Sequence, residues 1–240
     1  MFSTTLKQSV AGLATLAAFA AIVPATASAS TASRTGTNGH VLTLTAAAGE
    51  ANNIEVYSEP SYVLIWERNN TDPMWGEPAG CVNYNAAQVQ CPRSLVSSVY
   101  VDTGDNNDKI VATIDAPLGV TLSGGGGNDY VDVKGTVGSL TANANTPNLL
   151  GGDGYDQVYG WQFSDNLSGG YGDDVLGAGR GNDRLDGGPG ADRLDGGEDS
   201  DTIYARDGYR DFVACGTGYD SAQTDKPKFE ALYTGCEHAF

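Results

Sequence analysis

The sequence predicts an all-β protein in which a parallel β-solenoid fills the second half of the chain. Three observations support this prediction: a nine-residue repeat, a glycine count of 33 in 240 residues, and an excess of aspartate over glutamate of 22 to 8. Glycine is about twice as frequent as in an average protein, and aspartate tolerates turns. This composition favours many tight turns between short strands.

The nine-residue repeat runs without a gap from Gly151 to Tyr204. Its copies read GGDGYDQVY, GWQFSDNLS, GGYGDDVLG, AGRGNDRLD, GGPGADRLD and GGEDSDTIY. Position 6 is always aspartate: Asp156, Asp165, Asp174, Asp183, Asp192 and Asp201. Position 8 is always aliphatic: Val158, Leu167, Leu176, Leu185, Leu194 and Ile203. A further piece in the same frame, GGGGNDYVD, begins at Gly124.

Each copy predicts a tight turn followed by a strand of three residues. Glycine at positions 1, 2 and 4 permits the positive φ that such turns need. In the strand only the side chain at position 8 points inward, because neighbouring side chains alternate between faces. One aliphatic side chain per strand cannot bury itself, so the strands have to stack. Two copies then make one coil, and the coils form two thin parallel sheets back to back.

Stacking brings the aspartate of one copy beside that of the second copy after it. Carboxylates held this close repel each other and need a proton or a cation between them. Calcium takes about six to eight oxygen ligands, and a glycine-rich turn offers main-chain carbonyls beside the carboxylate. Magnesium suits the turns less well because it retains water in a rigid octahedron. The repeats therefore predict calcium-ion sites.

Composition argues against several other functions. The chain has 13 Lys and Arg against 30 Asp and Glu, a net charge of −17, which disfavours nucleic acids and anionic membranes as partners. Two histidines and four scattered cysteines offer little for a zinc site. The H-E-x-x-H and G-x-S-x-G motifs are missing from the sequence. Asp102-Thr103-Gly104 matches the triplet around an aspartic-protease carboxylate, but no second triplet occurs. We expect no enzyme and no catalytic residues.

The N-terminus predicts a secretory signal peptide. Lys7 precedes a nearly continuous apolar run from Val10 to Val23, and Ala27-Ser28-Ala29 predicts cleavage after Ala29. No second apolar stretch approaches membrane length, so we expect no membrane span. An exported chain favours disulfides over reactive thiols. Four cysteines allow three pairings, of which the local one, Cys81–Cys91 with Cys215–Cys236, needs the least rearrangement.

The pattern G-G-x-G-x-D-x-aliphatic-x occurs at Gly151–Tyr159, Gly169–Gly177 and Gly187–Asp195. It resembles the haemolysin-type, or repeats-in-toxin (RTX), calcium-binding nonapeptide. The segments LTLTAAAGEANNIEV, VYVDTGDNNDKIV and CGTGYDSAQTDKPKFEALYTGCE are similar to secreted actinobacterial calcium-binding proteins. The resemblance implies a parallel β-roll with calcium between turns, and a C-terminal cap closed by a disulfide.

The resemblance also implies the ligands of three sites. The leading turn supplies the carbonyls of positions 2 and 4 and its aspartate, and the next turn on the same edge supplies the carbonyls of positions 1 and 3 and its aspartate. The first site comprises Gly152, Gly154, Asp156, Gly169, Tyr171 and Asp174. The second comprises Gly170, Gly172, Asp174, Gly187, Pro189 and Asp192. The third, on the opposite edge, comprises Gly179, Gly181, Asp183, Gly196, Glu198 and Asp201.

Some pieces depart from the pattern. Trp161 and Phe163 replace glycines, which leaves the role of Asp165 open. The in-frame pieces VKGTVGSLT and ANANTPNLL lack the aspartate and predict coils without ions, so that Asp129 has no partner on its edge. The frame slips by one after Tyr204, and either Asp207 or Asp211 could then complete a site with Asp192. We expect about three ions, within a range of about two to five.

We divide the chain by residue numbers. The divisions are a signal peptide at 1–29, a β-rich N-terminal cap with the Cys81–Cys91 loop at 30–100, degenerate solenoid coils at 101–150, calcium-binding repeats at 151–213 and a C-terminal cap at 214–240. The expected function is that of a secreted calcium-ion-binding protein. The alternatives are an extracellular adhesin or matrix component that binds surface polysaccharide, and a hydrolase with an unrecognised site.

Overall fold

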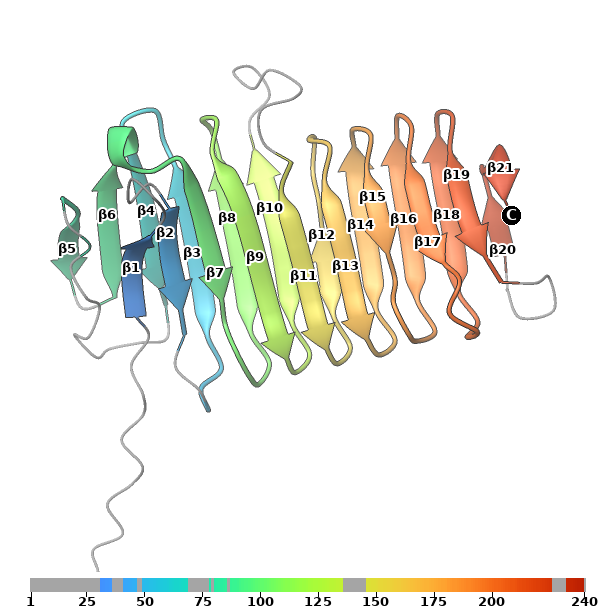
Figure 1. Ribbon diagram of the computed structural model, residues 1–240, viewed down its shortest axis with the longest axis horizontal. Coiled ribbons are helices and arrows are strands. Elements are labelled where there is room, and N and C mark those ends of the chain that lie inside the picture. The colour runs from blue at the N-terminus through green and yellow to red at the C-terminus, as the bar shows by residue number, and fades with distance from the viewer. Residues whose placement is uncertain are drawn as a thin grey trace, which may run out of the picture.

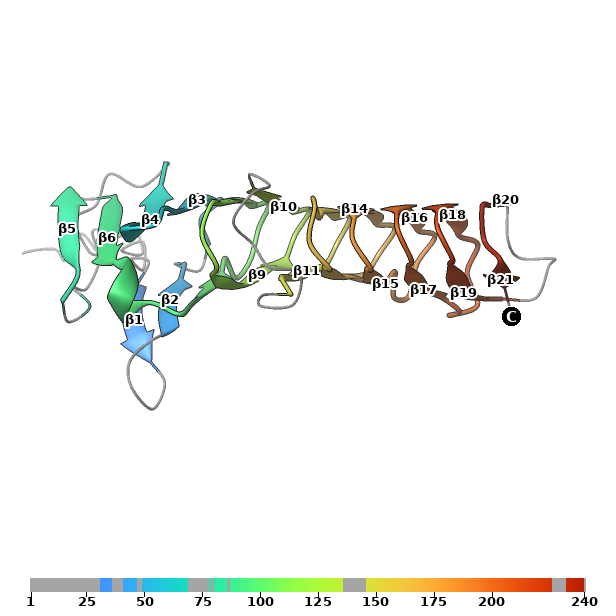
Figure 2. The same cartoon turned by 90° about the horizontal axis from the view of Figure 1, so that it is seen from above.

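The computed structural model describes residues 31–35, 41–46, 49–68, 78, 80–85, 87–135, 146–225 and 232–239. The predicted signal peptide lies outside these residues. The described part of the chain is all-β, with two long sheets lying back to back (Figures 1 and 2). Its helical content is a single 3-10 turn, Arg93–Leu95. No helix in this part is both long enough and apolar enough to cross a membrane.

The first sheet has ten strands, and all its neighbours are parallel except β1 and β2. In spatial order they are β1 (Thr31–Thr35), β2 (Val41–Thr45), β7 (Ser98–Asp102), β9 (Gly119–Gly126), β11 (Asn148–Asp153), β13 (Asn166–Tyr171), β15 (Arg184–Asp186), β17 (Thr202–Ala205), β19 (Ser221–Thr224) and β21 (His238–Ala239).

The second sheet has eleven strands, parallel from β3 to β20 and antiparallel among β3, β4, β6 and β5. In spatial order they are β5 (Val82–Asn85), β6 (Gln88–Pro92), β4 (Tyr62–Glu67), β3 (Asn53–Ser58), β8 (Lys109–Ile114), β10 (Tyr130–Gly135), β12 (Gln157–Tyr159), β14 (Val175–Arg180), β16 (Arg193–Glu198), β18 (Phe212–Thr217) and β20 (Leu232–Thr234).

Both local disulfides are formed, which confirms the pairing that needs the least rearrangement. Cys81–Cys91 joins the segment just before β5 to β6 at the N-terminal end. Cys215–Cys236 joins β18 to the segment between β20 and β21 at the C-terminal end. Each covalent link therefore lies near one end of the stack, where a coil has a neighbour on one side alone.

The register confirms a coil of two nine-residue copies. Leu149 pairs with Leu167 in the first sheet and Val158 with Leu176 in the second, so each step along a sheet is two copies long. The frame slip after Tyr204 lengthens the next step by one residue, because Leu194 pairs with Val213. The chain alternates between the sheets, so its turns form two rows of loops, at the upper and lower edges of Figure 1.

One expected coil is missing, and this corrects the prediction for Asp129. Leu122 pairs with Leu149, and Val131 with Val158, so these steps are three copies long instead of two. The two pieces without aspartate, VKGTVGSLT and ANANTPNLL, therefore do not form a coil of their own. They supply the end of β10 and the start of β11, and the residues between, 136–145, are outside the described part. Asp129 consequently has a neighbour on its own edge, Asp156.

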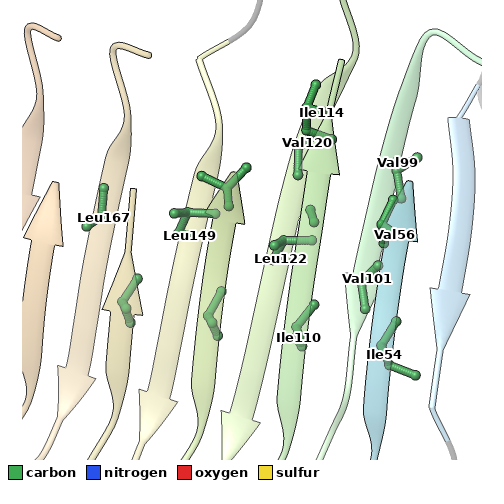
Figure 3. Close-up of a cluster of buried hydrophobic side chains, with 14 of the residues drawn as sticks. Ile54, Val56, Val99, Val101, Ile110, Ile114, Val120, Leu122, Leu149 and Leu167 are labelled. Carbon is green, nitrogen blue, oxygen red and sulfur yellow. The ribbon is translucent and has the colours of Figure 1, made fainter. Parts of the chain in front are cut away.

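Several strands of the repeats are longer than predicted, whereas β12 and β15 have the predicted three residues. β11, β13, β14 and β16 have six residues, because the chain stays extended through positions 1 to 3 of the following copy. Positions 6, 8 and 1 of each copy then face inward, and position 1 is glycine in five of the six copies. The core between the sheets is continuous (Figure 3), but it changes along the chain. β9 buries Val120 and Leu122, whereas β13 buries Leu167 as its one large aliphatic side chain.

Glycine at position 1 has a different cause from the one predicted. Positive φ occurs at positions 2 and 4, as in Gly170 (112°) and Gly172 (126°), but not at the position 1 residue Gly169. A Cβ on Gly169 would lie 2.4 Å from Oδ2 of Asp174. At Gly169 the buried carboxylate of the same turn therefore occupies the space that a side chain would need.

Candidate metal sites

Two rows of aspartates run along the two edges of the solenoid, and we call them the aspartate ladders. The first-edge ladder is Asn52, Asp108, Asp129, Asp156, Asp174, Asp192 and Asp211. The second-edge ladder is Asp165, Asp183, Asp201, Asp220 and Glu237. In both, the main-chain N–H of one member donates to a side-chain oxygen of the next at 2.6–2.9 Å. From the second member of each ladder onward, the side chain thus points back toward the preceding coil.

In several of the ladder aspartates the second carboxylate oxygen lacks a donor. Within the described residues, Oδ2 is buried and accepts no hydrogen bond in Asp129, Asp156, Asp174, Asp183, Asp192 and Asp201. These six residues are 1–3 % exposed, and none takes part in the ion pairs of the described chain. A buried carboxylate without a counter-charge is costly. The ladders therefore contain negative charge that the polypeptide itself does not compensate.

Burial raises the pKa of six ladder aspartates far above the ordinary value for aspartate. The pKa is about 7 for Asp129, Asp174, Asp183 and Asp201 and about 8 for Asp165 and Asp192. For Asp174, the hydrogen bond from the Asp156 N–H offsets part of the rise in pKa that burial causes, whereas the nearby Asp156 carboxylate adds to that rise. In the absence of a cation, the ladders hold protons at a pH where ordinary aspartates have lost them.

The first predicted site lies between two consecutive turns of the first edge. A Cβ on Gly170 would lie 1.9 Å from the carbonyl oxygen of Gly152, and one on Gly172 would lie 1.6 Å from that of Gly154. Both carbonyls of the leading turn therefore point toward the following coil. Replacing either glycine of that coil would close the gap they point into.

The carbonyls of the following turn point back into the same gap. The Tyr171 carbonyl accepts a hydrogen bond of 2.7 Å from the N–H of Gly154. The Gly169 carbonyl oxygen would lie 2.6 Å from a Cβ on Gly151. Asp156 and Asp174 are consecutive members of the first-edge ladder. The structure thus brings the six residues of the first predicted site together around one gap.

The second predicted site repeats this arrangement one coil further on. The N–H groups of Gly170 and Gly172 donate at 3.0 Å to the carbonyls of Gly187 and Pro189, respectively. The carbonyls of Gly170 and Gly172 point forward, 2.1 and 1.8 Å from where Cβ atoms on the glycines of the next turn would lie. The ladder places Asp174 beside Asp192.

The third predicted site lies on the second edge. The Gly181 N–H donates to the Glu198 carbonyl at 3.2 Å. The Gly179 carbonyl oxygen points forward, 2.0 Å from a Cβ built on Gly197. Asp183 and Asp201 are consecutive ladder members, and Oδ2 of Asp201 lies against Gly196, 2.5 Å from a Cβ built there. The residues predicted for all three sites are therefore neighbours in the structure.

A family model described as the RTX calcium-binding nonapeptide repeat (4 copies) matches residues 120–134, 162–194 and 177–209. The chain carries RTX calcium-binding repeats. No curated protein and no solved structure matches the chain. The matched residues include the turn of Asp129 and the second and third predicted sites, whereas Gly151–Asp156 lies between the matched stretches.

The donors of these RTX repeats fit a calcium ion. Among the described residues, no three Asp, Glu, His or Cys side chains converge on a common point, so a metal here must take much of its coordination from main-chain oxygens. Each gap supplies two ladder carboxylates and carbonyls from both of its turns. An all-oxygen set of this kind suits calcium, whereas zinc prefers nitrogen and sulfur ligands. The donor-free Oδ2 atoms are the positions at which the polypeptide lacks a cation.

Sequence reasoning missed a fourth gap of the same form, between the RTX turn of Asp129 and that of Asp156. Cβ atoms on Gly152 and Gly154 would lie 1.8 and 1.6 Å from the carbonyl oxygens of Gly125 and Gly127. The Gly127 N–H donates to the Asp153 carbonyl at 2.7 Å. The intact motif GGGGNDYVD was the available signal, but its distance of three copies, instead of two, concealed the partner turn.

The turn before this gap is closed by a side chain instead. Thr103 occupies the place of position 1, and its hydroxyl donates to the Gly124 carbonyl at 2.9 Å. In the RTX turns this carbonyl of the following coil is one of the predicted ligands. Asp102, of the Asp-Thr-Gly triplet, accepts a hydrogen bond of 3.2 Å from the Gly104 N–H within the same turn.

The departures from the RTX pattern also have definite places. Asp165 begins the second-edge ladder, because the corresponding residue of the preceding coil is Pro147, which has no N–H to donate. Its Oδ2 accepts a hydrogen bond of 3.0 Å from the Trp161 N–H. Asp211 follows Asp192 in the first-edge ladder. The Asp207 carboxylate accepts a hydrogen bond of 2.8 Å from the Gly190 N–H. It thus takes the place of the position 3 carbonyl that accepts the corresponding bond in the other turns.

Proposed function

We propose that the chain is a secreted protein that binds calcium ions in the gaps between RTX turns, and that these ions drive the folding of its repeats into a β-roll. The supporting observation is the row of buried Oδ2 atoms without donors in the aspartate ladders. Two carboxylates and the carbonyls of two turns surround each gap. Calcium would be held by these oxygens and would neutralise the charge of the ladder.

Energetics favour a fold that depends on the ion. Residues 151–225 contain sixteen acidic residues and five arginines, a net charge of −11. Each repeat contributes one large aliphatic side chain to the core. This apolar burial is small compared with the entropy lost by ordering nine residues. A ligand that binds the folded state alone adds its binding free energy to the stability of that state.

A location outside the cell agrees with the disulfides and with the calcium affinity expected of such sites. Disulfides persist in oxidising compartments, and the chain contains two. Extracellular modules bind calcium with dissociation constants of about 10⁻⁴ to 10⁻³ M, a range that suits folding after export. The apolar N-terminal segment provides a route for export. Calcium would then act as a signal of the compartment, because the repeats would stay unfolded where the ion is scarce.

The decisive experiment is a calcium titration of the ion-stripped chain, with disulfides intact, by far-UV circular dichroism and isothermal titration calorimetry. We expect strand signal to appear as about four ions bind, and the same concentrations of magnesium to have little effect. Removing the calcium should reverse the change. A strand signal that is the same with and without calcium, together with no binding heat, would refute the proposal.

A further inference from the structure

The residue at position 5 of the turns makes hydrogen bonds of its own. Its side chain accepts from the main-chain N–H at position 5 of the next coil. On the first edge these bonds join Asn107 to Asn128 (2.8 Å), Asn128 to Tyr155 (3.0 Å) and Asp173 to Ala191 (2.9 Å). On the second edge they join Ser164 to Asn182 (3.3 Å), Asn182 to Ser200 (3.0 Å) and Ser200 to Tyr219 (3.3 Å). We call these side chains the outer ladder.

The outer ladder runs in the opposite direction to the aspartate ladder beside it. Asn182 accepts from the N–H of Ser200, in the coil that follows. The adjacent residue, Asp183, donates its own N–H forward to Oδ1 of Asp201. Where both ladders are present, two adjacent residues therefore hold a pair of turns together, one through its side chain and the other through its main chain. The bond to the Asn182 side chain is exposed, whereas the bond from the Asp183 N–H is buried.

The two ladders differ in chemistry as well. The outer ladder is mostly uncharged, since five of its six acceptors are Asn or Ser. Its acceptors lie on exposed or half-buried residues, outside the gaps that contain the buried Oδ2 atoms. It therefore does not depend on a cation for neutralisation. It can hold two turns at their spacing without support from the ion in the gap.

We propose that the outer ladder positions successive turns for ion binding and thereby sets the calcium affinity of the gap beside it. This inference rests on the proposed function. The physical reason is that a bond between two turns contributes to ordering them, so less of the ordering cost is left to the binding of the ion. The position 5 side chains are positioning residues, and the oxygens of other residues hold the ion.

Interruptions of the outer ladder make the proposal specific. Tyr155 provides no such acceptor for the N–H of Asp173, so no outer bond accompanies the gap between Asp156 and Asp174. The second edge is continuous from Ser164 to Tyr219. The gap between Asp156 and Asp174 should therefore bind calcium more weakly than the second-edge gap of Asp183.

The test uses three variants of the full chain and a matched control, titrated with calcium by calorimetry. Asn182→Ala should raise the calcium concentration for half-binding at one site about fivefold, the effect of one hydrogen bond, without changing the number of ions. Asn182→Ser should restore wild-type affinity, because serine makes the same bond from Ser164 and Ser200. Tyr155→Asn should lower the half-binding concentration of one first-edge site, because the new amide can accept from Asp173.

Asn166→Ala is the matched control. The Asn166 side chain donates to Asn148 of the preceding coil at 3.0 Å, but on the outer face of the sheet rather than in a turn. The control should leave calcium binding unchanged, and circular dichroism at saturating calcium checks that every variant folds.

Each adverse result has a distinct meaning. If the wild type binds calcium but Asn182→Ala matches Asn166→Ala in affinity, the positioning role is wrong and the proposed function stands. If Asn182→Ala loses an ion, Asn182 is itself a ligand, and the positioning role is again wrong. If the wild type takes up no ions at all, the proposed function and this inference both fail.

Discussion

Asp129 and Asp156 lie far apart in the sequence, yet the N–H of Asp129 donates a hydrogen bond of 2.7 Å to Oδ1 of Asp156. The same bond joins Asp156 to Asp174, one regular coil further on, at 2.8 Å. The aspartate ladder therefore continues across the interruption of the sequence repeat. Because a ladder aspartate borders one gap on each side, its place in the row determines how many ion sites it serves.

We predict that Asp156→Ala removes two calcium ions and Asp129→Ala removes one. Asp156 borders the gap shared with Asp129 and the gap shared with Asp174. Asp129 borders one such gap, because on its other side the Thr103 hydroxyl donates to the Gly124 carbonyl. Calorimetric stoichiometry of each variant against the wild type checks this. An unchanged number of ions in Asp129→Ala would show that the gap between Asp129 and Asp156 is not a calcium site.

Asp174→Ala should weaken calcium binding much more than Asp165→Ala. Asp174 belongs to two predicted sites, so its loss should also reduce the cooperativity of binding between them. Asp165 begins its row, and its Oδ2 already accepts a hydrogen bond from the Trp161 N–H. Calcium titrations followed by circular dichroism compare midpoint and steepness directly. Equal effects of the two substitutions would contradict the shared role of Asp174.

The ion-stripped chain should gain ordered strand structure as the pH falls from about 8 to about 5. Burial raises the pKa of Asp174 to about 7 and that of Asp192 to about 8, whereas an unfolded aspartate has a pKa of about 3.9. Between these values the folded state binds more protons than the unfolded state, so its stability is greatest below about pH 4 and is lost as the pH rises through about 7 to 8.

Calcium should reverse this pH dependence, because the ion needs ionised carboxylates and its binding releases protons. The affinity for calcium should therefore fall as the pH is lowered over the same range. Circular dichroism of the ion-stripped chain and calorimetry in two buffers of different ionisation enthalpy measure the two effects. Ion-free strand content that rises with pH would contradict uncompensated burial of the ladder carboxyls.

The sequence was sufficient to predict the period of the fold and the residues that meet at the sites. An aliphatic residue at every position 8, as in Leu167 and Leu185, allows one register, because a shift by one residue would expose the whole row. The same register brings Asp174 beside Asp156 and Asp192. Stacking was thus predictable wherever the repeat was exact.

Other features depend on contacts that the repeat pattern does not express. The step from Val131 to Val158 is a whole number of copies, so the pattern could not show that a single coil spans it. Gly169 is glycine because of the carboxylate later in the same turn, a contact that exists only after folding. The outer ladder was missed because Asn182 and Ser164 share an acceptor function but no obvious sequence pattern.

Substitution by alanine at two adjacent glycines should affect the stability of the chain very differently. Gly127 has a φ of 135°, and a Cβ there would lie 2.0 Å from the main-chain oxygen of Asn106. At Gly126 the nearest atom, the Gly104 oxygen, is 3.9 Å away, and the backbone conformation suits any residue. Gly127→Ala should therefore destabilise the calcium-loaded chain by about 3 kcal/mol or more, while Gly126→Ala should stay within about 1 kcal/mol of the wild type.

Thermal unfolding at saturating calcium distinguishes these two outcomes. For a chain of this size the melting temperature of Gly127→Ala should fall by about 6 °C or more, since about 1 kcal/mol corresponds to about 2–4 °C. Gly127→Ala should also bind calcium more weakly, because its carbonyl points into the gap between Asp129 and Asp156, and Gly126→Ala should not. Equal melting temperatures for the two variants would mean that consecutive turns are not stacked as closely as the carbonyl contact requires.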